Sequence, residues 1–87
     1  MYYCYLIKSQ KSGKLYYGFT GDLQRRFAEH NAGKSPYTSR WRPWLLVYYE
    51  AYQSEKDARK REASLKLNGR ALAQLKLRIK DSIDHEV

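Results

Sequence analysis

The first twenty residues alternate between two sets of side chains in the way that a β-hairpin does. Tyr3, Tyr5 and Ile7 fall on one face of an extended chain, and the residues between them fall on the other. Residues 9–13, SQKSG, have the composition of a turn. Residues 14–20 then resume the strand pattern. In a hairpin without a bulge Tyr5 lies opposite Tyr16, so two phenols are expected to project from the same face.

The next pattern is that of an amphipathic helix over residues 23–31. Leu23 and Phe27 stand four residues apart and are expected to face the sheet. Arg26 and His30 form a second pair with the same spacing, directly beside that apolar edge. Taken alone, these two residues read as a solvated helix charge and a helix-end residue favoured by the dipole.

A third strand and a second helix follow. Residues 44–52, WLLVYYEAY, are a short, nearly continuous apolar and aromatic run, which predicts a buried central or third strand with a purely structural role. Asp22 and Ser54 are the expected N-caps of the two helices. The second helix is expected to run from Ser54 to a stop at Asn68 and Gly69.

One carboxylate of this second helix breaks its apolar pattern. Ala58 and Leu65 lie on the side expected to pack inward, and Glu62 falls between them at helical spacing. A structural ion pair with a nearby lysine or arginine is one explanation. Packing alone would not select a carboxylate that points at a sheet carrying phenols, so Glu62 is a candidate functional residue.

The last segment, residues 70–83, carries four aliphatic residues at helical spacing and is expected to form one C-terminal helix. The element order is therefore strand, strand, helix, strand, helix, helix. This order predicts an α+β fold with a small, mostly antiparallel three-stranded sheet flanked by helices. The 87 residues are enough for one domain with a single modest core.

Composition narrows the classes of function. Seventeen Lys and Arg against nine Asp and Glu leave a net charge of +8, which favours a polyanionic partner such as nucleic acid. A single cysteine fits a reducing compartment, and no apolar run approaches the length of a membrane span. We therefore expect a cytoplasmic protein. The sequence predicts no helix that combines a broad apolar face with a basic face, so binding to a membrane surface is not suggested.

The connection formed by residues 33–43, GKSPYTSRWRP, concentrates cations, hydroxyls and aromatic rings. Lys34, Arg40 and Arg42 have no acid nearby in the sequence, and Lys60 adds a charge on the second helix. Such a set suits phosphate contacts and base stacking, although an ordinary exposed loop explains it equally well.

Together these residues resemble the GIY-YIG nuclease family, specifically its small stand-alone members, over about residues 2–66. The first motif arm corresponds to residues 3–5, YCY, and the second to residues 16–18, YYG. The family's first-arm Gly and Ile are Tyr3 and Cys4 here, and its second-arm Ile is Tyr17. An asparagine that assists some family members has no secure counterpart in this sequence.

The resemblance implies a site made of Tyr5, Tyr16, Arg26, His30 and Glu62. Glu62 would hold one Mg²⁺ or Mn²⁺ ion, and Arg26 would clamp the phosphate. Either phenol would act as general base, with His30 at the rim of the site sharing that role or positioning the phosphate. We expect these side chains to converge in one cleft.

The implied activity is metal-dependent hydrolysis of phosphodiester bonds in nucleic acid, with DNA rather than RNA as the expected substrate and a role in DNA repair or recombination. Three other functions remain open from the sequence. They are a basic nucleic-acid-binding module with weak or partner-dependent cleavage, a structural, ribosome-like basic protein, and a small enzyme acting on another phosphate ester.

Overall fold

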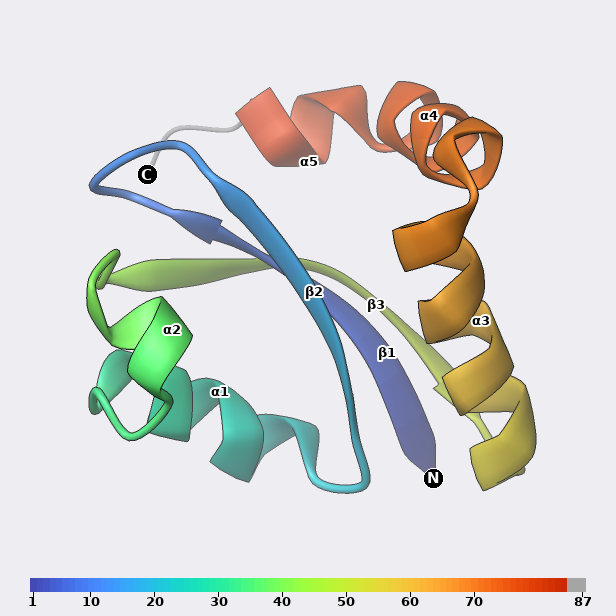
Figure 1. Ribbon diagram of the computed structural model, residues 1–87, viewed down its shortest axis with the longest axis horizontal. Coiled ribbons are helices and arrows are strands. Elements are labelled where there is room, and N and C mark those ends of the chain that lie inside the picture. The colour runs from blue at the N-terminus through green and yellow to red at the C-terminus, as the bar shows by residue number, and fades with distance from the viewer. Residues whose placement is uncertain (85–87) are drawn as a thin grey trace.

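The computed structural model describes residues 1–84 and shows a three-stranded antiparallel sheet between two layers of helix. The strands are β1 (Tyr2–Ser9), β2 (Leu15–Thr20) and β3 (Trp44–Tyr52), in the spatial order β2-β1-β3. Figure 1 looks toward β2, with α1 and α2 on one side of the sheet and α3 on the other. The predicted α+β class and element order are confirmed.

The β1–β2 hairpin forms as predicted, but its register differs from the expected one by two residues. Tyr5 pairs with Gly18, and Ile7 pairs with Tyr16. In this register the turn is closed between Ser9 and Lys14, where the Ser9 backbone N–H donates to the Lys14 carbonyl at 2.9 Å. The shift is even, so Tyr5 and Tyr16 still project from one face, as diagonal rather than direct neighbours.

The third strand is an edge strand, and the expectation of burial is wrong for part of it. Trp44 is buried, whereas Leu46 and Tyr49 are exposed. The apolar run predicts burial along the whole of β3, but β1, which pairs on both sides, is the central strand and β3 lies at the edge. A local register irregularity between Leu6 and Ile7 interrupts the β1–β3 ladder.

The helix α1 (Leu23–Asn31) has the predicted bounds and the predicted N-cap. The Asp22 carboxylate accepts from the Arg25 backbone N–H at 3.1 Å. At the other end the Asn31 side chain donates to the Trp44 carbonyl at 3.0 Å and accepts from the Trp44 N–H at 2.6 Å. These two bonds fix the last turn of α1 against the start of β3.

The basic connection contains a short helix, α2 (Pro36–Ser39), that the sequence did not predict. The remaining helices are α3 (Glu55–Leu67), α4 (Gly69–Arg78) and α5 (Lys80–Asp84). The single helix expected over residues 70–83 is thus divided, because Ile79 departs from helical geometry with φ −113° and ψ 27°. Ser54 caps α3 as predicted.

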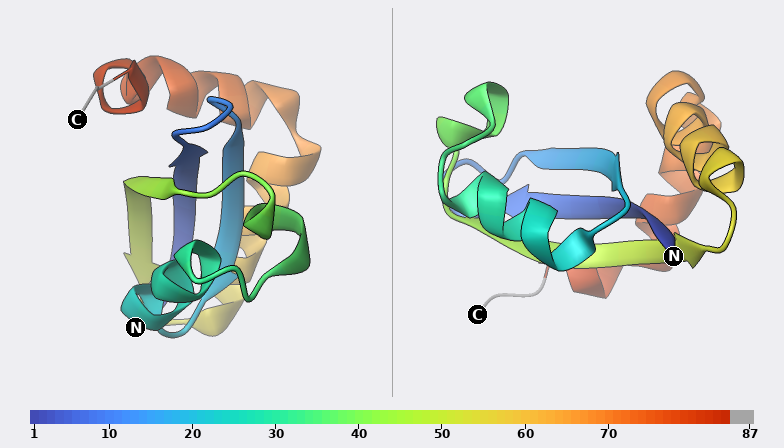
Figure 2. Two further views of the ribbon diagram at one scale, coloured as in Figure 1. Left: turned by 90° about the vertical axis from the view of Figure 1, so that its left-hand side faces the viewer. Right: turned by 90° about the horizontal axis from the view of Figure 1, so that it is seen from below.

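Each face of the sheet has its own hydrophobic cluster. One cluster joins Tyr5, Ile7 and Trp44 to Leu23 and Phe27 of α1. The other cluster, on the opposite face, joins Cys4 and Leu6 to Leu65 of α3, Leu75 of α4 and Ile79, which follows α4. The two views in Figure 2 show the sheet between these helical layers. Within residues 1–84 no helix has the length and apolar character needed to cross a membrane.

Candidate active site

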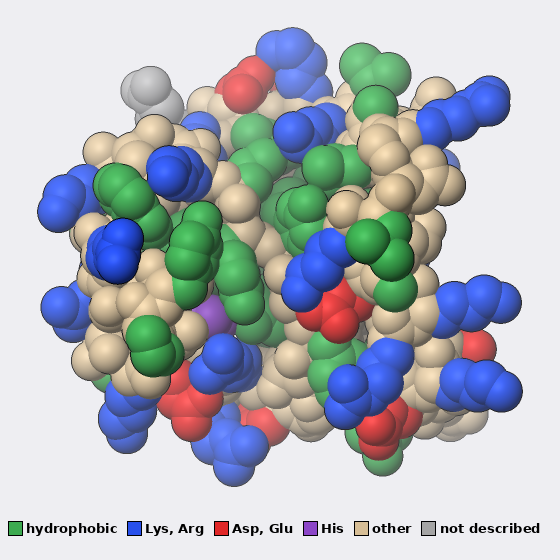
Figure 3. Space-filling model, viewed as in Figure 1, with side chains coloured by type: hydrophobic (Ala, Val, Ile, Leu, Met, Phe, Trp, Pro, Cys, Tyr) green, Lys and Arg blue, Asp and Glu red, His purple; other side chains and the backbone are tan. Residues whose placement is uncertain are grey.

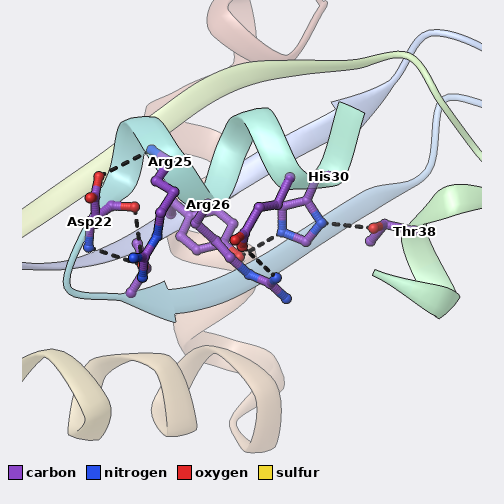
Figure 4. Close-up of polar contacts among 8 residues, drawn as sticks. Asp22, Arg25, Arg26, His30 and Thr38 are labelled. Carbon is purple, nitrogen blue, oxygen red and sulfur yellow. Dashed lines mark hydrogen bonds and ion pairs between the residues drawn. The ribbon is translucent and has the colours of Figure 1, made fainter. Parts of the chain in front are cut away.

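A chain of three polar side chains lies under α1, on the face of the sheet that α1 covers. The Tyr5 hydroxyl is 2.8 Å from His30 Nε2, and His30 Nδ1 is 2.7 Å from Thr38 Oγ1. His30 and Thr38 are fully buried, and Tyr5 is 2% exposed. Figure 4 shows His30 extending from α1 toward Thr38 on α2. Three elements therefore meet at one imidazole.

The helix periodicity explains why His30 reaches this position. Leu23 and Phe27 pack on the sheet, so Arg26 and His30, three residues after each of them, are carried toward β2. His30 was expected at the rim of the site, but its ring is buried between Tyr5 and Tyr16. The sequence did not show this burial because the ring's second partner lies on α2.

Thr38 is the main polar residue of the site whose role the sequence did not reveal. Its hydroxyl is one of those that made the connection of residues 33–43 suit phosphate contacts, but the side chain is buried against His30. The Thr38 carbonyl also accepts from the Trp44 indole N–H at 2.9 Å. Its position two residues after Pro36, in a segment that can start a helix, was the only signal available.

Burial sets the protonation of the Tyr5–His30 pair. Burial and the nearby Arg26 charge lower the pKa of His30 to about 4, while Glu29 opposes them weakly. The imidazole is therefore neutral at pH 7. Burial also raises the pKa of the Tyr5 phenol to about 12, and the Arg26 guanidinium beside the hydroxyl works in the opposite direction.

Gly18 leaves the space that the Tyr5 phenol occupies. A Cβ atom at residue 18 would lie 2.6 Å from the Tyr5 hydroxyl oxygen and 2.8 Å from its ring carbon Cζ. Real Cβ atoms essentially never approach a neighbour this closely. The phenol therefore crosses β2 where this edge strand has no side chain.

Tyr16 lies beside this buried chain, closer to solvent. Its ring is 5.3 Å from the His30 ring in an edge-on contact and 5.9 Å from the Tyr37 ring. Tyr16 is half-buried, whereas Tyr5 is almost completely enclosed. The two phenols thus have different environments within one site.

Arg26 supplies the positive charge of this group. Its guanidinium is 3.2 Å from the Glu29 carboxylate one turn along α1, and its side chain is 33% exposed. One carboxylate neighbour at a partly open position leaves other guanidinium N–H groups for a phosphate.

Glu62 lies on the flank of α3 nearest β2. Ala58 and Leu65 point into the core as predicted, and Arg61 and Glu62 lie on opposite sides of that stripe. Arg61 reaches Glu50 on β3, while Glu62 pairs with Lys66 at 2.9 Å. The Glu62 side chain is 20% exposed.

Although α3 packs on the opposite face from α1, the Glu62 charge acts on the Tyr5 hydroxyl across the β2 edge. The Glu62 and Tyr16 charges both raise the pKa of Tyr5, whereas the Arg26 charge lowers it. Figure 3 faces this edge and shows hydrophobic side chains between helices that carry charged groups. Tyr16, Arg26 and Glu62 therefore each lie within electrostatic reach of the Tyr5 hydroxyl.

A second carboxylate, Glu50, has a different environment. It accepts hydrogen bonds from the Tyr48 and Tyr52 hydroxyls and from Arg61 Nε. Burial alone would raise the pKa of Glu50, but the bonds from these three groups hold it below its ordinary value. Glu50 is thus a structural carboxylate of the α3-covered face, as the structural interpretation of β3 predicted.

The donor set fits a hard cation bound by one carboxylate. Among residues 1–84 no three His, Cys, Asp or Glu side chains gather as a complete metal cage. Mg²⁺ commonly uses one or two carboxylates and takes its other ligands from water and substrate phosphates. Glu62 has an oxygen donor of this kind at a partly open edge.

The four cations predicted to bind nucleic acid are all exposed: Lys34, Arg40, Arg42 and Lys60. The first three follow α1 and α2, and Lys60 lies on α3. Arg42 is held locally, because its Nε donates to the Ser39 carbonyl at 3.0 Å and its side chain covers Gly33.

Comparison with known proteins identifies the family to which the chain belongs. A family model described as the GIY-YIG catalytic domain matches residues 1–76. The chain therefore belongs to the GIY-YIG family, a family of nucleases that act on nucleic acid and generally use a divalent metal. No solved structure matches the chain.

Curated relatives of similar size carry the name UPF0213 protein. One from Staphylococcus haemolyticus is 42% identical over 66 residues, which are 75% of this chain and 79% of the relative. One from Bacillus pumilus is 36% identical over 89 residues, or 98% of this chain and 90% of the relative. One from Halobacterium salinarum is 40% identical over 72 residues, or 82% and 92%.

Proposed function

We propose that this protein is a divalent-metal-dependent endonuclease that hydrolyses phosphodiester bonds in nucleic acid, with DNA as the expected substrate. The observation that carries the proposal is the Tyr5 hydroxyl 2.8 Å from the neutral, buried His30 imidazole, with Arg26 and Glu62 acting on the same hydroxyl. This combines a proton acceptor, a phosphate-binding cation and a metal-binding carboxylate at one edge of the sheet.

In the proposed mechanism Tyr5 is the general base and His30 supports it. A neutral imidazole has one N–H donor and one acceptor nitrogen. With Nδ1–H donating to Thr38 Oγ1, Nε2 accepts the Tyr5 O–H. The Tyr5 oxygen then takes a proton from the attacking water as its own proton moves to Nε2. This relay avoids a free phenolate, which burial disfavours, and forms an imidazolium instead, which burial and the Arg26 charge oppose and the Glu29 charge favours.

Two other side chains act on the phosphate. The Arg26 fork binds its non-bridging oxygens and balances the charge that grows on them. Glu62 would hold the divalent cation, which when bound supplies Lewis-acid stabilisation of the phosphate and the departing oxygen. Tyr16 borders the substrate side of the site and orients the His30 ring by their edge-on contact.

Cleavage of labelled single-stranded, duplex and branched DNA and RNA, with Mg²⁺, Mn²⁺ or EDTA, tests this proposal. Tyr5→Phe removes the hydroxyl and keeps the ring, and we expect it to reduce cleavage by about a hundredfold or more. Tyr49→Phe is the matched control, since its phenol is 51% exposed and lies on β3. Equal cleavage by Tyr5→Phe and Tyr49→Phe would exclude Tyr5 as the base.

A nucleic-acid-binding module with weak or partner-dependent cleavage is the second candidate. The elevated pKa of Tyr5, about 12, favours it, because the phenol keeps its proton unless substrate changes the site. Salt-dependent binding by the wild type, without cleavage of any substrate in the panel, would select this function.

A further inference from the structure

A pocket opens beside the candidate active site, along β2. It is lined by Leu15, Tyr16, Tyr17, Tyr37 and Lys66. Aromatic rings and a single cation therefore form most of its wall.

Tyr37 is the exposed aromatic surface of this pocket. Its side chain belongs to α2 and is 58% exposed, and its ring lies 5.9 Å from the Tyr16 ring at 33°. The next residue, Thr38, is completely buried and bonded to His30 and Trp44. The Tyr37 ring is thus open to solvent, while the buried side chain and hydrogen bonds of Thr38 hold the adjacent backbone in place. Because this backbone is already ordered, little conformational entropy is lost when a ligand binds the ring.

Lys66 places a positive charge beside these rings. Its ammonium pairs with Glu62 at 2.9 Å, and the Lys66 side chain is 46% exposed. Lys66 is charged at neutral pH, as a partly exposed lysine ordinarily is. The pocket therefore lies one side chain away from the proposed metal-binding carboxylate.

We propose that this pocket receives one unpaired base of the substrate, stacked on Tyr37, with the adjacent phosphate on Lys66. The inference rests on the proposed function and gives that site its substrate class, a strand with at least one unpaired nucleotide next to the cleaved bond. A base within a duplex has both faces covered by its neighbours. Aromatic faces beside a cation are the chemistry by which proteins hold unpaired nucleotides.

A second pocket provides the comparison that makes this assignment specific. It is lined by aromatic and aliphatic residues that include Tyr3, Phe27 and Tyr49, but its charged lining residue is Asp22. A carboxylate repels the phosphate that accompanies every base. Each pocket has its own exposed tyrosine, Tyr37 in the first and Tyr49 in the second. The neighbouring charge is positive in the first pocket and negative in the second.

Fluorescence of 2-aminopurine tests the proposal in EDTA, where no cleavage occurs. The probe is placed in a single strand, in a perfect duplex, and as a one-nucleotide bulge in that duplex, each made as DNA and as RNA. We expect quenching and tighter binding with the single strand and the bulge, and neither with the duplex. Whichever of DNA and RNA binds more tightly identifies the source of the nucleotide.

The matched variants are Tyr37→Ala, Tyr37→Phe and Tyr49→Ala. Tyr37→Ala should abolish quenching and weaken binding of the bulge about tenfold, since one stacked base contributes about 1–3 kcal/mol. Tyr37→Phe keeps the stacking face and should behave like the wild type, as should Tyr49→Ala. Lys66→Met should reduce the salt slope of binding by about one.

Wild-type quenching by folded Tyr37→Ala, or equal quenching in the perfect duplex, would overturn the proposal. Its failure is distinguishable from failure of the proposed function. If quenching depends on Tyr37 but the protein cleaves no substrate, the base-binding proposal stands and the proposed nuclease function fails. Metal-dependent cleavage that is the same for Tyr37→Ala and wild type, with no quenching, keeps the nuclease and rejects the pocket.

Discussion

His30 should make the stability of this protein sensitive to mild acid. The imidazole is fully buried between Tyr5 and Thr38, and its pKa lies near 4 rather than the ordinary 6.5. The unfolded chain therefore binds a proton at His30 below pH 6.5 that the folded chain does not bind until about pH 4. The free energy of unfolding must fall as the pH falls through this window.

The size of this effect follows from the shift. Each pKa unit corresponds to about 1.4 kcal/mol, so a shift of this size removes roughly 3 kcal/mol of stability between neutral pH and pH 4. The groups that face the ring modify this value: the Arg26 charge enlarges the shift and Glu29 reduces it. Most carboxylates titrate at the lower end of the window, so they contribute little to the pH dependence of the free energy of unfolding above about pH 5.

Urea unfolding at half-unit steps from pH 7.5 to 4 measures the effect in wild type and His30→Gln. The wild-type curve should lose about 1 kcal/mol per pH unit more than the variant between pH 6 and 4.5, whatever the stability of the variant at pH 7. His85 lies outside the described residues and is present in both proteins, so it cancels. If His30→Gln does not fold, an NMR titration of the ring protons of wild-type His30 measures its pKa directly. Parallel unfolding curves, or titration of His30 near pH 6.5, would refute the burial argument.

Two further predictions concern Gly18 and the exposed cations. Gly18→Ala places a Cβ 2.6 Å from the Tyr5 hydroxyl, so we expect the phenol to move and cleavage to fall at least tenfold. The control is Gly69→Ala, where no atom lies within 4 Å of the added Cβ and cleavage should equal that of the wild type. An equal loss of cleavage in both variants would contradict the packing argument. If about four phosphates are neutralised, log K should fall with log salt at a slope of about −3 to −4 on DNA. A double Lys34→Ala, Arg40→Ala variant should flatten that slope by about two; a slope unchanged in fluorescence anisotropy would remove this loop from the interface.

Much of the fold could be predicted because local patterns and packing agree. Asp22 and Ser54 cap the helices that their positions predict, and Leu23 and Phe27 face the sheet as their spacing requires. Apolar periodicity cannot distinguish an edge strand from a central one. The mixed burial of β3 depends on which strand pairs on both sides, and that choice is made by tertiary contacts.

The family spacing selects the residues of the candidate site, whose roles stay predictions, but it does not give their geometry. The family spacing selects Tyr5, His30 and Glu62, which the structure brings to the β2 edge. The sequence did not show that His30 is buried, because that depends on Thr38 and on a short helix without strong local signals. It also did not show that Glu62 approaches from the other face of the sheet, since this depends on how α3 packs.

The central claim is that Glu62 supports metal-dependent cleavage, and the most direct test is Glu62→Gln. The change keeps the side-chain shape and removes the charge that would hold the cation. Its ion pair with Lys66 is partly exposed, so folding should change by only about 1 kcal/mol or less.

The measurement is single-turnover cleavage of one substrate by wild type and Glu62→Gln across a range of Mg²⁺ and Mn²⁺ concentrations, with binding measured in EDTA. Glu50→Gln is the matched control because the Glu50 carboxylate is bonded to the Tyr48 and Tyr52 hydroxyls and to Arg61 and has a structural role. We predict that Glu62→Gln binds as tightly as the wild type or more tightly, and cleaves at least about a hundredfold more slowly. Wild-type cleavage by folded Glu62→Gln would contradict the account.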